Sequence, residues 1–163
     1  MGRVSIHNHT YYSNIRILDA LANPEELIDR AVEIGLDGIA ITEHGNVCSA
    51  PRVNFYEEKI HEKHPHFKVI LGSEIYLTDT RNKNQMYYHC VLLAKNALGH
   101  KMLRELTSIA WLNSYYDRGM ERVPNLRSEV ENLIQKYGRG NLIMTQSCLG
   151  GRVNHHLLQM INC

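Results

Sequence analysis

Two histidines near the start of the chain have the spacing of a metal site. His7 and His9 lie two residues apart in the segment HNHTYYS (7–13), which follows the short run 4–6 of mainly apolar residues. Residues two apart on a strand point to the same face of a sheet, so both imidazoles can reach one ion. Neutral imidazole is a ligand that suits zinc. The pair therefore predicts a metal site at the end of a first strand.

Further residues of ligand type are scattered along the chain, and most of them follow predicted strands. Carboxylates can bridge two ions, and imidazole, carboxylate and thiolate groups gathered at strand ends are what a hydrolase with several metals needs. The candidates are Asp19, His44, Glu74, His89 and Cys148. A second group, His61, His64 and His66, is flanked by charged residues and proline and is expected to be a solvated helix end.

The elements that must position these residues alternate between strand and helix. Apolar periodicity and turn residues predict strands at 4–8, 38–42, 69–77, 88–94 and 142–145. Helices are predicted at 24–34, 50–63, 98–110, 128–137 and 153–161, with a loop at 115–127. Continuous apolar strands between helices favour an α/β fold with a parallel sheet or barrel, whose active site lies at the carboxyl ends of the strands. His89 is the exception, because it opens its strand.

Composition limits the classes of protein that the chain can belong to. Its 163 residues suit one domain, and a net charge of +1 excludes a strongly basic coat for nucleic acid. The four cysteines form no CxxC pair, so a disulfide framework or zinc ribbon is not expected and a reducing cytoplasm is the simpler setting. No stretch approaches the 18 apolar residues of a membrane span, and no membrane partner is expected.

The motifs HNHTYYS, ITEHGN, GSEIYL, YYHCVLLAKN and SCLGG, in this order, resemble the polymerase and histidinol phosphatase (PHP) domain. They are most similar to the version at the N-terminus of the bacterial (or phage) DNA polymerase III alpha subunit. The resemblance implies a distorted β/α barrel of seven strands that holds two or three divalent ions, zinc or manganese. The family's metal ligands fall on His7, His9, Asp19, His44, Glu74, His89 and Cys148, and Glu74 and His9 are the expected catalytic residues.

The chain departs from the family pattern at several points. Glu43 stands where the family usually has aspartate, Arg152 stands where glutamate is common, and the segment 13–20 (SNIRILDA) is about two residues longer than the commoner form. The last family motif, Asp-x-His, is absent. Residues 1–163 are therefore expected to be a PHP domain truncated at its C-terminus, without the last part of the barrel.

The function implied by the resemblance is that of the PHP domain of a replicative DNA polymerase. Its metal-dependent phosphoesterase site would give 3′–5′ exonuclease proofreading at the 3′ end of DNA, with the rest of the alpha subunit as partner. One alternative is an inert scaffold that stabilises the polymerase and contacts a separate proofreading subunit. Another is a stand-alone phosphatase, against which YYHCVLLAKN and SCLGG argue.

Overall fold

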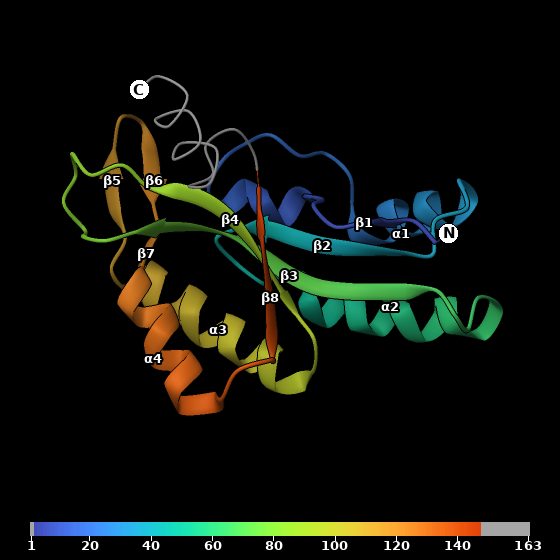
Figure 1. Cartoon of the computed structure of the whole chain (residues 1–163). Helices are drawn as coiled ribbons and strands as arrows, with labels where there is room; N and C mark the ends of the chain where they lie inside the picture. The colour runs from blue at the N-terminus through green and yellow to red at the C-terminus, as the bar shows by residue number, and fades with distance from the viewer. Residues whose placement is uncertain (1, 148–163) are drawn as a thin grey trace, which may run out of the picture.

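In the computed structural model, which describes residues 2–147, a mixed six-stranded sheet carries the long helices on one of its faces (Figure 1). Strands β1, β2 and β3 run parallel, whereas β4 and β8 are each antiparallel to the neighbour before them. A short strand, β7, pairs in parallel with the far end of β3. The strands of this sheet are β1 (Val4–Ser5), β2 (Gly38–His44), β3 (Lys68–Thr78), β4 (Tyr88–Ala94), β7 (Pro124–Leu126) and β8 (Leu142–Gln146).

The α/β class is confirmed, but the predicted parallel sheet is mixed, because β4 and β8 pair antiparallel. Because β4 reverses direction, its amino end lies at the same edge of the sheet as the carboxyl ends of β2 and β3. The carboxyl end of β8 returns to that edge, since β8 is antiparallel to β4. Among the described strands the sheet is curled rather than closed, with β1 and β8 at its two margins.

The remaining elements mostly follow the predicted bounds. The helices are α1 (Pro24–Glu33), α2 (Ala50–Lys63), α3 (Ala97–Leu112) and α4 (Arg127–Tyr137), and a 3-10 turn, η1, covers Tyr11–Ile15. The loop predicted at 115–127 is wrong: this segment forms β7 and a small hairpin of β5 (Tyr115–Asp117) and β6 (Met120–Arg122). The first strand ends at Ser5, earlier than predicted. The predicted helix at 153–161 lies outside the described residues.

Helix α1 begins and ends where its local sequence dictates. Asn23 accepts a hydrogen bond from the Glu26 amide (2.8 Å), and the Glu26 carboxylate accepts one from the Asn23 amide (3.2 Å), which completes a capping box. Pro24 occupies the first helical position, where its missing N–H costs nothing. Gly35 follows the last turn with a positive φ of 72°. These signals fix the length of the connection between the first two strands.

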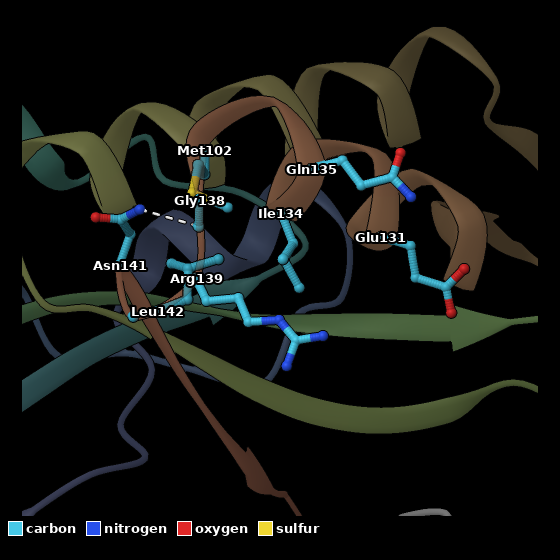
Figure 2. Close-up of a pocket in the computed structure, with 9 residues that line it drawn as sticks. Met102, Glu131, Ile134, Gln135, Gly138, Arg139, Asn141 and Leu142 are labelled. Carbon is cyan, nitrogen blue, oxygen red and sulfur yellow. Dashed lines mark hydrogen bonds between the residues drawn. The ribbon is translucent and has the colours of Figure 1, made fainter.

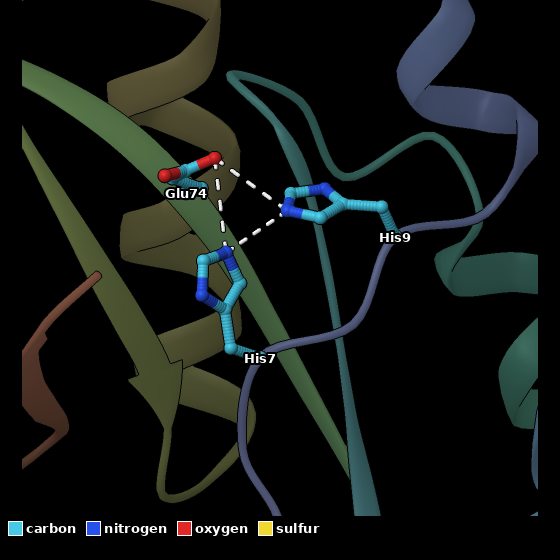
Figure 3. A group of neighbouring side chains, drawn as sticks. All are labelled: His7, His9 and Glu74. Atoms are coloured by element: carbon cyan, nitrogen blue, oxygen red, sulfur yellow. Dashed lines mark hydrogen bonds and ion pairs between the residues drawn. The ribbon is translucent and has the colours of Figure 1, made fainter. Parts of the chain in front are cut away.

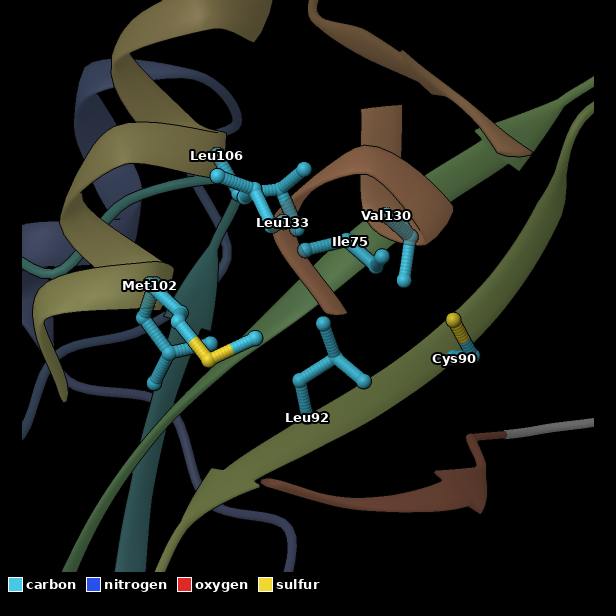
Figure 4. Packing of buried hydrophobic residues seen from close by; sticks show 8 residues of the cluster. Ile75, Cys90, Leu92, Met102, Leu106, Val130 and Leu133 are labelled. Carbon is cyan, nitrogen blue, oxygen red and sulfur yellow. The ribbon is translucent and has the colours of Figure 1, made fainter. Parts of the chain in front are cut away.

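Alternation along the strands gives the sheet one face that packs against the helices and an opposite face where polar side chains adjoin a smaller apolar cluster. Ile75 and Leu92 pack against Met102, Leu106 and Leu133 of α3 and α4 (Figure 4). A second cluster joins β2 to α1 and α2 through residues including Ile39, Ile41, Ile28 and Val53. Neighbouring residues of β2 and β3 point to the opposite face, because side chains alternate along a strand. We call that opposite side the inner face.

A surface hollow beside the turn from α4 into β8 lies away from the inner face (Figure 2). It is lined by residues such as Met102, Ile134 and Leu142, and Asn141 closes one side by donating to the Gly138 carbonyl (3.1 Å). Its lining contains neither histidine nor cysteine. Separately, no helix within residues 2–147 is long and apolar enough to cross a membrane.

Candidate metal centre

Glu74, in the middle of β3, lies among several imidazoles on the inner face of the sheet. Its side chain is only 3% exposed. One carboxylate oxygen, Oε2, is 2.7 Å from His44 Nδ1 and 3.5 Å from His9 Nε2. The other, Oε1, is 3.1 Å from His89 Nδ1 and accepts a hydrogen bond from the Ser147 hydroxyl. One buried carboxylate therefore meets side chains from distant segments of the chain.

Strand direction explains how these segments meet. His44 is the last residue of β2 and pairs in register with Glu74, so both side chains point to the same face. His89 is the second residue of β4 and pairs with Tyr76, two residues along β3 from Glu74. Because β4 is antiparallel, its first residues lie at the edge where β2 ends. The histidine that did not fit the strand-end rule thus reaches the same site as the others.

His7 and His9 bring their ring nitrogens together beside Glu74 (Figure 3). Their Nε2 atoms are 2.9 Å apart, although both residues follow β1 rather than lying on it. With a Glu74 oxygen they form a set of three ligand atoms within 4.8 Å of one another. Two imidazole nitrogens and a carboxylate are ligands that zinc accepts, and carboxylate also suits manganese. The donor set of these residues fits a divalent ion.

A buried hydroxyl orients the His9 ring. Ser13 Oγ donates to the Glu43 carboxylate (2.6 Å), and the amide and hydroxyl of Thr10 donate to the same group (3.0 and 2.6 Å). With its one proton used, Ser13 Oγ accepts from the His44 amide (3.0 Å) and from His9 Nδ1 (3.1 Å). This assigns the ring proton of His9 to Nδ1 and leaves a lone pair on Nε2, facing Glu74. Glu43 therefore acts on the site through Ser13.

His44 connects Glu74 to Asp19. Its Nε2 is 2.8 Å from Asp19 Oδ2, and its Nδ1 is 2.6 Å from the Tyr76 hydroxyl as well as close to Glu74. Burial by itself would lower the pKa of His44, but contacts with Glu74 and Asp19 outweigh burial and raise it. In the absence of metal, the His44 imidazole therefore favours its protonated form, held between the carboxylates of Glu74 and Asp19. Asp19 is the more open partner, with a side chain 41% exposed.

The central carboxylate and His9 respond to this environment in ways that favour metal ligation. Burial opposes ionisation of Glu74, but hydrogen bonds from His44, His7 and His89 hold its pKa well below its usual range. Burial, reinforced by the neighbouring His44, lowers the pKa of His9 to about 4. At neutral pH the site therefore presents an ionised carboxylate beside a neutral imidazole, which are the forms that bind metals.

The structure brings together most of the site residues that the sequence predicts. Those that share the inner-face cluster are His7, His9, Asp19, His44, Glu74 and His89. Cys148 lies outside the described residues. His61 stays at the end of α2, where Nε2 is bonded to the Phe67 carbonyl (2.8 Å). Sequence reasoning missed Thr10, Ser13, Tyr76 and Ser147. Their only signal was a place inside a quoted motif: HNHTYYS for Thr10 and Ser13, GSEIYL for Tyr76 and SCLGG for Ser147.

Comparison with known proteins gives one family and a consistent set of relatives. The model of the PHP domain matches residues 5–161. The chain is 39% identical over 168 residues to the protein named "Probable DNA polymerase YorL" of Bacillus subtilis and equally to a DNA-directed DNA polymerase of Bacillus phage SPbeta. It is 35% identical over 162 residues to the DNA polymerase III subunit alpha of Borreliella burgdorferi. These alignments cover 96%, 96% and 95% of the chain.

The chain spans about 13% of the length of each of these three relatives. Among solved structures, a candidate metal-dependent phosphoesterase from Bifidobacterium adolescentis aligns with a TM-score of 0.46 and 22% identity. That alignment covers 68% of this chain and 35% of the other.

Proposed function

Since the chain belongs to the PHP domain family, we propose that it is the N-terminal PHP domain of a DNA polymerase III-type alpha subunit with a phosphoesterase site. The proposed reaction is metal-dependent hydrolysis of the phosphodiester at the 3′ end of DNA, which would give 3′–5′ proofreading. The observation that carries this proposal is the placement of Glu74 within 4 Å of ring nitrogens of His7, His9, His44 and His89. Homology to polymerase subunits supplies the substrate class.

The proposed ligands divide into two neighbouring sets that share Glu74. His7 and His9 form the first set with one Glu74 oxygen. His44 and Asp19 form the second, and His89 approaches the other Glu74 oxygen. Cys148 is proposed as a further ligand from the family motif. This arrangement suits two or three zinc or manganese ions with Glu74 as the bridging carboxylate.

In such a site the protein's own contribution is to hold its ligand atoms and leave room for DNA. Divalent ions, when bound, supply Lewis acidity and lower the pKa of a coordinated water. Ser13 keeps the His9 lone pair directed at the centre, and the Tyr76 hydroxyl fixes the ring of His44. Side chains of His7, His9 and Asp19 are 29%, 21% and 41% exposed, so this end of the cluster is open to a substrate. No nucleophilic side chain is required.

The principal alternative is that the domain is a scaffold that contacts a separate proofreading subunit. A scaffold does not need a buried glutamate placed among four histidines, as Glu74 is. Burying such charged or polar groups is costly unless they are paired or coordinate metal. Retention of the cluster therefore favours the phosphoesterase over the scaffold.

The decisive experiment uses the full-length gene product purified without chelator. Elemental analysis would measure bound zinc and manganese, and a 5′-labelled single-stranded oligonucleotide would report stepwise shortening from the 3′ end. We expect at least two metal ions per chain and hydrolysis that stops on addition of EDTA. Metal binding without DNA cleavage would favour the scaffold, and a metal ratio near zero after supplementation would rule out the metal centre.

A further inference from the structure

Arg16 is a nearly buried cation beside the metal centre that none of the roles described above uses. It caps η1, donating its backbone N–H to the Ser13 carbonyl (3.1 Å). In the sequence it stands between two proposed ligands, His9 and Asp19. The residue is only 9% exposed. Its guanidinium carbon lies over the Tyr76 ring, 3.7 Å from the ring centre.

The guanidinium has no anionic partner among residues 2–147. Its Nε is buried and makes no hydrogen bond there, and no carboxylate within those residues forms an ion pair with it. By contrast Arg52, Arg81 and Arg127 each meet a carboxylate. A buried charge without a counter-charge is costly, and an aromatic face offsets only part of that cost. The guanidinium of Arg16 therefore has no counter-charge of its own within residues 2–147 and can accept an anionic ligand.

Tyr76 connects this cation to the metal ligands. Its hydroxyl is 2.6 Å from His44 Nδ1, and its ring meets the His89 ring edge-on at a centroid distance of 4.8 Å. Arg16 thus stands over one face of a phenol whose hydroxyl and edge touch two members of the cluster.

We propose that Arg16 binds phosphate oxygens of the substrate next to the metal centre and so sets the position of the scissile phosphodiester. The planar guanidinium presents paired N–H donors that match two oxygens of a phosphate, a geometry that an ammonium group does not provide. This inference rests on the proposed function, because it names the residue that holds the substrate of the same site. The ligand class is a phosphate mono- or diester, with inorganic phosphate as the smallest probe.

The test measures phosphate binding directly in the full-length gene product loaded with manganese. Isothermal titration calorimetry would measure the affinities for inorganic phosphate and thymidine 5′-monophosphate. The proteins compared are the parent, Arg16→Met, Arg16→Lys and Arg30→Met. Arg30 is the matched control, because it lies on α1 in an exposed ion pair with Glu33. We expect Arg16→Met to weaken binding of both probes by about 10-fold or more, from the loss of charge-assisted hydrogen bonds. The phosphate affinity of Arg16→Lys should lie between those of the parent and Arg16→Met, and the affinity of Arg30→Met should match that of the parent.

Metal content and thermal unfolding of each variant separate this role from a structural one. Unchanged metal content together with weaker phosphate binding in Arg16→Met supports the inference. Equal phosphate affinity in parent and variant overturns it, as does a joint loss of metal and phosphate, since Arg16 would then be holding the fold. DNA hydrolysis is measured separately. If phosphate binding depends on Arg16 but no DNA is hydrolysed, this inference stands and the proposed exonuclease activity is withdrawn. If DNA is hydrolysed at the same rate with and without Arg16, the exonuclease proposal stands and this inference is withdrawn.

Discussion

The hydroxyl of Ser13 lies 3.1 Å from Nδ1 of His9. This is the ring nitrogen that does not face Glu74. Ser13 donates its own proton to the buried Glu43 carboxylate, so towards His9 it can only accept. This relationship fixes both the orientation and the tautomer of His9. Glu43 stands where the family usually has aspartate. It does not contact His9 itself but holds Ser13, which orients His9.

Ser13→Ala should weaken metal binding by about 10–100-fold, the range found when a partner that orients a metal-ligating histidine is removed. The His9 ring would lose its hydrogen bond, and Glu43 would lose one of its donors. Competition with a fluorescent chelator measures the affinity. Ser49→Ala is the matched control, because Ser49 is buried and makes no capping hydrogen bond. Equal losses in the two variants would show that the effect of Ser13 is general destabilisation.

Glu74→Gln keeps the shape of the central side chain and removes its charge. If Glu74 bridges metals, the change should release at least one ion and reduce 3′–5′ hydrolysis by roughly 10–100-fold or more. Rates would be compared on the 5′-labelled oligonucleotide with manganese or zinc supplied. His61→Ala should leave the rate near that of the parent, since His61 lies at the end of α2. Equal activity in both variants would point to a contaminating nuclease or to a Glu74 that is not a ligand.

Metal should also stabilise the folded domain, because the ligand set exists only when β2, β3 and β4 are assembled. Manganese at 100 times its dissociation constant is expected to add about 2.7 kcal/mol to the free energy of unfolding. Urea titrations with manganese and with EDTA measure the difference. The gain should shrink in Glu74→Gln. Parent curves that coincide with and without metal would contradict the predicted centre.

Leu106→Ala tests the core that supports β3 from its helical side. Leu106 is 1% exposed and packs against Ile75 and Leu92 (Figure 4), so its truncation should cost about 2–5 kcal/mol of unfolding free energy. Leu112→Ala, on the same helix but 86% exposed, should stay within about 0.5 kcal/mol of the parent. Urea denaturation followed by circular dichroism compares them. A small loss at position 106 would mean that this core is loosely packed.

Much of the fold is written in local sequence. The capping residues Asn23 and Glu26 with Gly35 bounded α1, and apolar runs predicted β4 at its observed limits, because capping and burial depend on neighbours along the chain. Spacing along a predicted strand selected His7 and His9, whose ring nitrogens do meet, although both residues follow β1 instead of lying on it. Apolar patterning did not predict the short strands within 115–126, because each has only three residues and few of these are apolar.

What the tertiary structure decided is direction and contact between distant segments. The reversal of β4 put His89 beside Glu74, and no local pattern states whether a strand pairs parallel or antiparallel. Ser13 donates a hydrogen bond to Glu43, 30 positions along the chain. Arg16 lies over the ring of Tyr76, which is 60 positions away. Serine, threonine and arginine are common and carry no spacing signal of their own. Their roles arise from which buried groups lack a partner once the sheet has formed, and that is settled only by the assembled fold.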